Sequence, residues 1–137
     1  MLIRTFRIEG LGHLSTLIAD DEAGVAAVVD PRRDVDVYLA AAREADVRIT
    51  HVVETHLHND YVSGGRDLAA LTGARQVIGA GAELRHEHAP VRHAETFDVG
   101  SLRFAALETP GHTPEHVAYS VADTGRGPDA AVLFSGG

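Results

Sequence analysis

The most informative stretch of this sequence is Glu54-Thr55-His56-Leu57-His58-Asn59-Asp60-Tyr61-Val62-Ser63-Gly64-Gly65. It follows residues 49–53, which we interpret as a buried strand. In an extended segment residues two apart project to the same side, so we expect His56, His58 and Asp60 to point one way. Two imidazoles that converge from one short segment suit a metal ion with bonds of about 2.0–2.1 Å. The pattern alone is also compatible with a pair of exposed turn histidines, and with Asp60 as a cap of the following helix.

A second histidine segment, Thr109-Pro110-Gly111-His112-Thr113-Pro114-Glu115-His116, also follows a predicted strand. Its Pro-Gly pair favours a tight turn, which would place His112 at a strand exit, as His56 is. A third imidazole would give a three-histidine site with an open fourth position, an arrangement that activates bound water. The plainer interpretation of His112 is a turn residue that bonds to backbone. For His116 there are two interpretations: it lies behind the metal ligands, or it faces solvent on the next strand.

Together, the two segments resemble those of the metallo-β-lactamase superfamily, and most closely its persulfide dioxygenase and glyoxalase II branch. The wording of residues 54–65 is especially similar to proteins that fuse this domain to a rhodanese domain. The resemblance covers essentially the whole chain, because the opening strands, the Asp30-Pro31 turn and both segments occur in the expected order. It implies an α+β fold of the αββα sandwich type. We expect residues 1–137 to be the N-terminal part of such a domain, truncated at its C-terminal end.

The resemblance also implies roles for individual residues. His56, His58 and His112 would be the ligands of one divalent metal ion, Zn or Fe(II). Asp60 would bind a second metal in two-metal relatives, or act in catalysis as a carboxylate that orients water in one-metal relatives. The partner of the site would be a small thiol-derived substrate, of the glutathione persulfide or thioester type.

Two positions depart from the family pattern. Tyr61 stands where the family usually has a histidine, and a phenol with a pKa of about 10 is a poor substitute for imidazole. This argues against a second metal and leaves Tyr61 either to hydrogen-bond the substrate or to fill the missing metal's space. Gly137 stands where the family segment Phe-(Ser/Thr)-Gly-Asp has its ligand aspartate. Without that carboxylate, three histidines and water suit zinc at least as well as iron.

Periodicity and turn residues predict the elements around these segments. Strands are expected at 2–8, 13–19, 25–29, 49–53, 76–78, 96–99, 102–107, 117–121 and 131–134. We expect Asp34 to cap a helix over 35–45, and a second helix over 64–72 to turn Leu68 and Leu71 inward and to end at Gly73. The stretch 79–95 gives no clear pattern. The remaining histidines are expected to be ordinary solvated residues, namely His13, His51, His86, His88 and His93.

The 137-residue composition, 45% hydrophobic and 23% charged, is that of an ordinary globular domain. A net charge of −8 would be repelled by phosphate backbones and by anionic lipid, so we expect neither nucleic acid nor membrane as a partner. The chain has no cysteine, which excludes disulfides, thiolate metal sites and cysteine nucleophiles within it. With no signal-peptide pattern and no apolar run near the roughly 20 residues of a membrane helix, a cytoplasmic location is expected. A truncated sheet would leave an unpaired edge, so we expect a homo-oligomer through that edge or a marginally stable domain.

Three classes of function remain open at this point. The leading one is a metal-dependent enzyme, either an Fe(II) persulfide dioxygenase or a zinc-dependent thioester hydrolase. The second, favoured by Tyr61 and Gly137, is a catalytically degenerate domain that binds a metal or a sulfur metabolite without turnover. The third is an assembly module. A β-lactamase activity is not implied, because a shared fold does not transfer the substrate.

Overall fold

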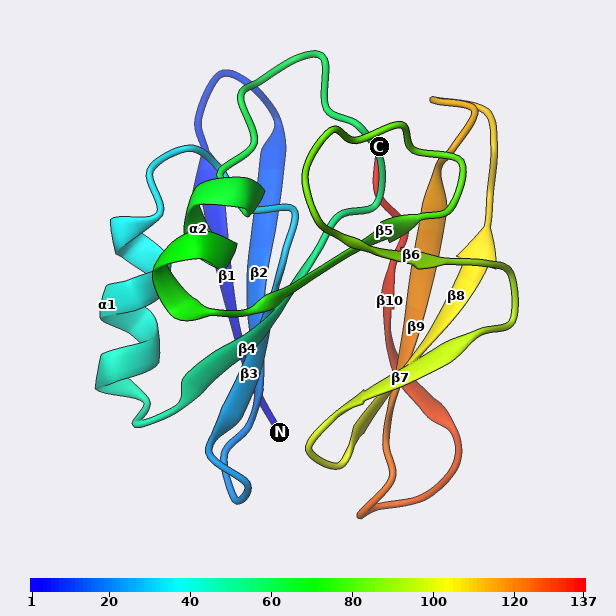
Figure 1. Ribbon diagram of the computed structural model, residues 1–137. Coiled ribbons are helices and arrows are strands. Elements are labelled where there is room, and N and C mark those ends of the chain that lie inside the picture. The colour runs from blue at the N-terminus through cyan, green and yellow to red at the C-terminus, as the bar shows by residue number, and fades with distance from the viewer.

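The computed structural model describes residues 1–137 as two β-sheets packed against each other, with two helices outside the first sheet (Figure 1). The first sheet has the order β1-β2-β3-β4-β5-β6. Its strands are β1 (Leu2–Ile8), β2 (His13–Asp20), β3 (Val25–Val29), β4 (Arg48–Val53), β5 (Arg75–Gly79) and β6 (Ala89–Val91). The second sheet is antiparallel, with the order β10-β9-β8-β7. Its strands are β7 (Thr96–Val99), β8 (Leu102–Glu108), β9 (Val117–Asp123) and β10 (Ala130–Phe134).

The first sheet changes from antiparallel to parallel pairing halfway across. Strands β1 to β3 pair antiparallel, whereas β3, β4, β5 and β6 pair parallel. Parallel neighbours need a crossover connection, and the helices α1 (Asp36–Glu44) and α2 (Gly65–Thr72) provide two of them. The C-terminal ends of the parallel strands therefore all lie on the same side of the sheet. The connection that leaves β4 there carries the first histidine segment.

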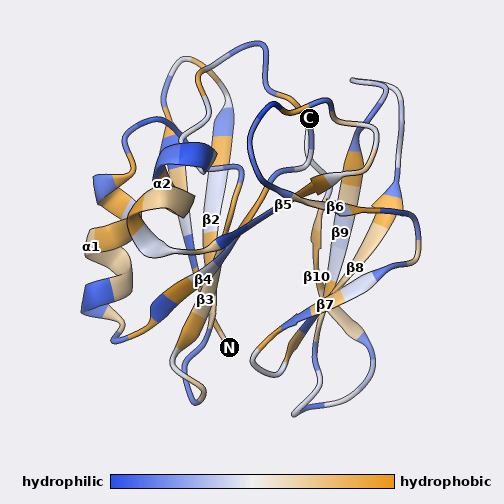
Figure 2. Cartoon of the chain, viewed as in Figure 1, coloured by the Kyte–Doolittle hydropathy of each residue, from blue (hydrophilic) through white to orange (hydrophobic).

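Two hydrophobic cores hold the three layers together. One core lies between the sheets and joins residues such as Val29 and Val53 to Phe104 and Tyr119. The other lies between the first sheet and the helices and is centred on Tyr38. The hydropathy colouring of Figure 2 places the hydrophobic residues mainly on the strands. The chain thus forms the helix, sheet and sheet layers of the expected αββα sandwich, and the second sheet carries no helix of this chain on its outer face (Figure 1).

Most predicted elements are present with bounds within two residues of the prediction, and the details that differ concern the helices. Asp34 does not cap α1: the N-cap is Val35, without a side-chain hydrogen bond, and Asp34 faces the guanidinium of Arg32 at 3.4 Å. Leu68 is fully buried as expected, but Leu71 is 64% exposed. The prediction for Leu71 was wrong because the sheet-facing side of α2 runs through Gly65 and Leu68, and Leu71 lies a further 60° around the helix axis, by the 100° per residue of an α-helix.

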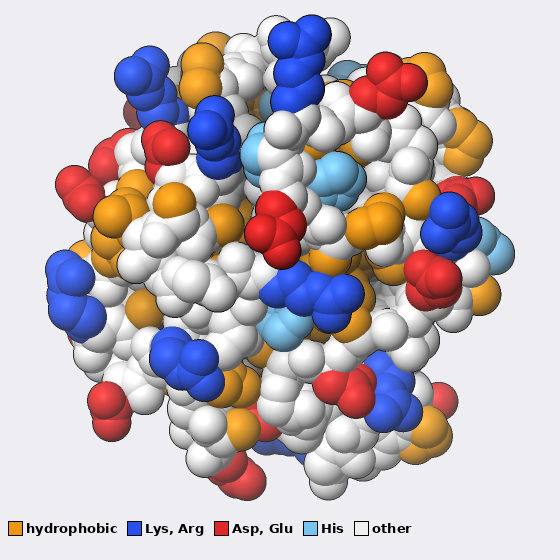
Figure 3. Space-filling model, in the orientation of Figure 1, with side chains coloured by type: hydrophobic (Ala, Val, Ile, Leu, Met, Phe, Trp, Pro, Cys, Tyr) orange, Lys and Arg blue, Asp and Glu red, His pale blue; other side chains and the backbone are white.

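The unpatterned stretch 79–95 contains the short strand β6, which pairs with β5 at the sheet edge. Its middle residue is Pro90, which an edge strand tolerates because one side of its backbone has no partner strand. Neither helix is long and apolar enough to cross a bilayer. On the face of the molecule shown in Figure 3, acidic and basic side chains are interspersed.

Candidate metal centre

The two histidine segments meet at one end of the molecule, although they leave different sheets. The first follows β4 in the first sheet, and the second connects β8 to β9 in the other. Two hydrogen bonds join them: the backbone N–H of Val117 donates to the Thr55 carbonyl at 2.8 Å, and the N–H of Leu57 donates to Glu115 Oε1 at 2.7 Å. One bond between backbone groups and one bond from a backbone N–H to the Glu115 carboxylate therefore hold the two loops in a fixed relation.

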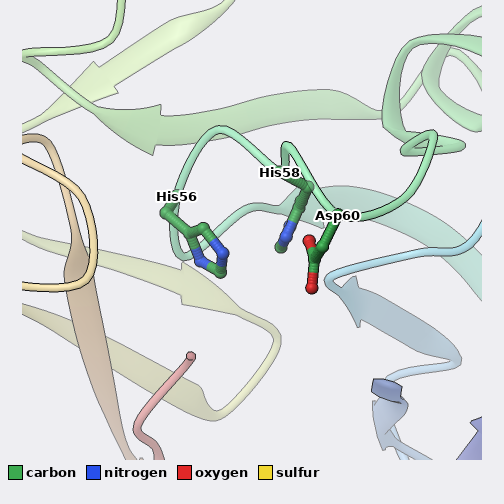
Figure 4. A group of neighbouring side chains, drawn as sticks. All are labelled: His56, His58 and Asp60. Atoms are coloured by element: carbon green, nitrogen blue, oxygen red, sulfur yellow. The ribbon is translucent and has the colours of Figure 1, made fainter. Parts of the chain in front are cut away.

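Three imidazole rings lie against one another at this junction. The ring centroids of His56 and His58 are 4.1 Å apart, and those of His56 and His112 are 4.7 Å apart. The first segment bends rather than continuing as a strand, yet ligand atoms of His56, His58 and Asp60 lie within 4.8 Å of one another. Figure 4 shows these three side chains projecting from one loop into the same space. They line a cavity of about 260 Å³ together with His13, Asp30, Tyr61, His112 and Gly137, among others.

His56 presents its Nε2 atom because its other ring nitrogen is occupied. The Thr55 hydroxyl donates to Asp30 Oδ2 at 2.8 Å, so its oxygen accepts from His56 Nδ1, also at 2.8 Å. This arrangement places the imidazole proton on Nδ1 and leaves the Nε2 lone pair free. Burial, followed by the nearby His58, lowers the pKa of His56 to about 4, so the ring is neutral at pH 7 and able to bind a metal.

His58 is held through the opposite nitrogen. Its Nε2 lies 3.0 Å from Glu54 Oε2 and 3.2 Å from Asp30 Oδ1. Burial lowers the pKa of His58, but the hydrogen bonds to these two carboxylates outweigh it and raise the pKa to about 9. Nδ1 is buried and has no partner in the protein. A buried nitrogen without a partner is costly, and a metal ion that replaces the Nδ1 proton would satisfy it.

Asp30 contacts several residues of this site, although the sequence indicated only a turn at this position. Beyond its bonds to Thr55 and His58, its backbone carbonyl accepts from His13 Nε2 at 3.0 Å and from the Tyr61 hydroxyl at 3.5 Å. Its backbone has a φ of 50°, a strained value for a residue with a side chain. Asp30 follows β3 directly, and the parallel pairing of β3 with β4 places it next to the residues that follow β4.

His13 was expected to be solvated, and this was wrong. It begins β2, is buried, and lies in the wall of the cavity. The ring of Tyr61 packs on it with a centroid distance of 3.9 Å and on His58 at 4.4 Å. Burial raises the pKa of Tyr61, so this phenol stays protonated at neutral pH. Both roles considered for Tyr61, a hydrogen bond to the substrate and filling the missing metal's space, stay predictions.

His112 and Gly137 lie close together in the lining of the cavity. His112 is exposed on its loop. A Cβ atom built on Gly137 would lie 2.7 Å from His112 Nε2 and 3.2 Å from His56 Cε1. The position at which the family carries its ligand aspartate is thus adjacent to both rings, and here it offers no side chain.

The other histidines lie outside the cavity. His116 is buried behind His56, with its ring stacked on it at 5.2 Å and its Nδ1 2.8 Å from the Thr109 hydroxyl. His51 was expected to be solvated but packs between the sheets, stacked on Phe97 at 5.5 Å. His86 is partly buried and bonds to the side chain of Gln76 at 2.8 Å.

Comparison with known proteins connects this geometry to a family. A family model described as the metallo-beta-lactamase superfamily matches residues 8–127. Curated relatives include the hydroxyacylglutathione hydrolases of Erythrobacter litoralis, 31% identical over 121 residues, and of Cereibacter sphaeroides, 39% identical over 113 residues. These alignments cover 88% and 80% of this chain but only 45% and 43% of the relatives, so the chain spans about half of their length.

Solved structures give the same result. A metallo-beta-lactamase from Staphylococcus aureus superimposes with a TM-score of 0.93 at 32% identity, covering 98% of this chain and 43% of that one. ETHE1 from Myxococcus xanthus superimposes with a TM-score of 0.84 at 31% identity, covering 88% of this chain and 54% of that one. The chain therefore belongs to the metallo-beta-lactamase superfamily, within its glyoxalase II and ETHE1-like branch.

Proposed function

We propose that residues 1–137 carry the metal site of an enzyme that acts on a small thiol-derived molecule. His56, His58 and His112 would hold one divalent ion, Zn or Fe(II). The observation that carries this proposal is the unpartnered, buried Nδ1 of His58 beside the free Nε2 of His56, both at one cavity wall. Residues 1–137 would then be the N-terminal part of a longer catalytic domain.

A single bound ion would supply Lewis-acid activation of a water, thiol or oxygen ligand at its open position. Position 61 has a tyrosine in place of the family's histidine, and position 137 has a glycine in place of its ligand aspartate. Both differences support one metal ion rather than two. Asp60 is exposed and lies beside His56 and His58, so it would orient the ligand or water at the cavity mouth. His116, which stacks on His56 from behind, would keep that ring in place.

Two reactions fit this site, and each has its own support. The first is thioester hydrolysis, in which an acyl-glutathione and water give a carboxylic acid and glutathione. The names of the hydroxyacylglutathione hydrolase relatives favour it. The second is persulfide oxidation, in which glutathione persulfide, O₂ and H₂O give glutathione, sulfite and two protons. The single metal expected from Tyr61, and the resemblance of the two histidine segments to the persulfide dioxygenase branch, favour it.

Metal analysis of the purified chain tests the proposal. Near-stoichiometric zinc or iron by elemental mass spectrometry is expected, and it should be lost in a His56→Ala/His112→Ala double variant. A His93→Ala variant, which alters a histidine outside the cavity, should retain the metal. A parent chain that takes up no metal after reconstitution with Zn²⁺ or with Fe²⁺ under argon contradicts the proposal. Oxygen consumption with glutathione persulfide and hydrolysis of an acyl-glutathione then separate the two reactions.

The rival function is a degenerate domain that binds without turnover, and Gly137→Asp separates it from the enzyme. The new side chain would point at the exposed ring of His112, which has room to move. If the parent already turns over one of the two substrates, the missing carboxylate is dispensable. Activity that arises only in Gly137→Asp would instead identify the parent as a metal-binding domain without catalysis.

A further inference from the structure

We infer that Glu54 is a positioning residue that orients His58 so that Nδ1 of this ring is directed to the metal. The inference rests on the proposed metal site. It assigns a role to the first residue of the histidine segment, which the sequence analysis did not place in the site.

Glu54 is almost completely enclosed, with 2% of the residue exposed. Its Oε2 lies 3.0 Å from His58 Nε2, and its Oε1 accepts from the Ser63 hydroxyl at 2.5 Å. Ser63 Oγ in turn accepts from the backbone N–H of Gly65 at 2.9 Å. Both carboxyl oxygens are therefore used, and the chain of bonds anchors the carboxyl group to the start of α2.

Glu54 is the acceptor dedicated to His58, although Asp30 also contacts the same nitrogen. Asp30 Oδ1 lies farther away, at 3.2 Å, and also accepts from the backbone N–H of Thr55 at 2.8 Å. The other oxygen of Asp30 accepts from the Thr55 hydroxyl. Both carboxyl oxygens of Asp30 are thus bound by Thr55, the residue that also bonds to His56 Nδ1. Glu54 Oε2 bonds to His58 alone.

The start of α2 is built around this carboxyl group. A Cβ atom on Gly65 would collide with Glu54 Oε1, and it would also lie 2.9 Å from the side-chain nitrogen of Gln76. Glycine is a poorer helix former than alanine, so a glycine in α2 calls for a reason other than helix propensity. The glycine at position 65 makes room for the Glu54 carboxyl group, and Ser63 binds that group. These contacts explain why Ser63 and Gly65 follow Glu54 and His58 in the sequence.

In a metal-bound histidine, the hydrogen-bond partner of the second ring nitrogen sets the tautomer and the direction of the ring. Loss of this partner lowers the metal affinity by about 10–100-fold. Glu54→Leu removes the acceptor at similar volume. Glu54→Gln keeps an oxygen for His58 Nε2–H and an amide that can donate to Ser63 Oγ. Glu83→Leu, at an exposed glutamate outside the site, is the matched control.

The test is Co²⁺ and Zn²⁺ binding to the metal-stripped chain, followed by competition with a chromogenic chelator and by the visible Co²⁺ absorption bands. Glu54→Leu is expected to bind about 10–100-fold more weakly with altered bands. Glu54→Gln and Glu83→Leu are expected to stay within about threefold of the parent. Parent-like affinity and bands in a folded Glu54→Leu overturn the inference, whereas absence of binding in the parent itself overturns the proposed metal site.

If circular dichroism shows Glu54→Leu to be unfolded, two gentler variants decide. Gly65→Ala displaces the Glu54 carboxyl group without removing it, and Ser63→Ala removes its anchor. Both are expected to weaken Co²⁺ binding and to change its bands while the chain remains folded. Parent-like binding in both overturns the inference.

Discussion

His56 and His58 each offer one free nitrogen because a neighbouring oxygen occupies the other. For His56 this oxygen is the Thr55 hydroxyl, and for His58 it is a carboxylate of Glu54 or Asp30. The Thr55 hydroxyl has only one proton, which goes to Asp30, so it is forced to accept from His56. At the scale of single residues, the chemistry of the site is therefore determined by the partners of the histidines as much as by the histidines.

Thr55→Val tests this arrangement. The substitution keeps the shape but leaves Asp30 Oδ2 and His56 Nδ1 without their shared partner in a fully buried place. We expect the free energy of unfolding, measured by urea titration, to fall by about 1–3 kcal/mol. Thr55→Ser retains the hydroxyl and should recover most of that loss. Equal stability of the valine and serine variants would contradict the hydrogen-bond argument.

At the scale of elements, the register of the parallel strands places the two carboxylates side by side. Val29 of β3 is paired with Val53 of β4, so the next residues, Asp30 and Glu54, leave the sheet at the same level. The N–H of Asp30 donates to the Val53 carbonyl at 2.8 Å, which continues the ladder by one bond. His58 then returns over both of them. Helix α2 covers the neighbouring face through Gly65 and Leu68.

The two leucines of α2 provide a matched pair for testing how this helix is seated. Leu68 is fully buried against the sheet, so Leu68→Ala should lower the free energy of unfolding by about 2–5 kcal/mol. Leu71 is exposed, and Leu71→Ala should stay within about 0.5 kcal/mol of the parent. Thermal and urea unfolding of both variants measure this difference. Similar losses in the two would mean that α2 is rotated relative to the arrangement described here.

At the scale of the whole molecule, the proposed ligands come from both sheets. His56 and His58 follow β4 of the first sheet, and His112 precedes β9 of the second. A metal ion held by all three would therefore connect the two layers at their shared end. Binding to the folded chain alone would also shift the folding equilibrium towards the folded state.

We expect Zn²⁺ to raise the thermal unfolding midpoint of the metal-stripped chain. A free concentration 100 times the dissociation constant adds about 2.7 kcal/mol to the free energy of unfolding. At the same free Zn²⁺ concentration the His112→Ala variant should gain much less, because loss of one ligand raises the dissociation constant. The measurement is calorimetry with and without Zn²⁺, with excess chelator as the reversal control. Equal stabilisation of parent and variant would remove His112 from the ligand set.

A second whole-molecule prediction concerns pH and the contact between the sheets. His51 of β4 stacks on Phe97 of β7, and burial, with a smaller effect of Arg75, lowers the pKa of His51. The unfolded chain then binds a proton more readily than the folded chain, so stability falls as the pH drops below about 6.5. His51→Phe keeps a ring on Phe97 but does not titrate. It should lose less stability than the parent between pH 7.5 and pH 5.5 in urea unfolding, and an identical loss would contradict this assignment.

The sequence by itself determined the positions of nearly all strands along the chain, the two helices and the family, because these depend on short-range patterns. Alternation, buried apolar runs and turn residues are local properties, and so is the spacing of the two histidine segments. The departures at Tyr61 and Gly137 could likewise be read directly. What these patterns could not give was the orientation of an eight-residue helix, and so Leu71 was misplaced.

Only the tertiary structure identified Asp30, Glu54 and His13 as parts of the site. Their roles depend on the register between β3 and β4 and on the approach of β2, which bring together residues from three separate segments. A buried carboxylate or imidazole is defined by the partners that surround it, and those partners are distant in the sequence. The ring nitrogens that remain free for a metal were fixed by the same contacts, and for this reason they followed from the fold rather than from the motif.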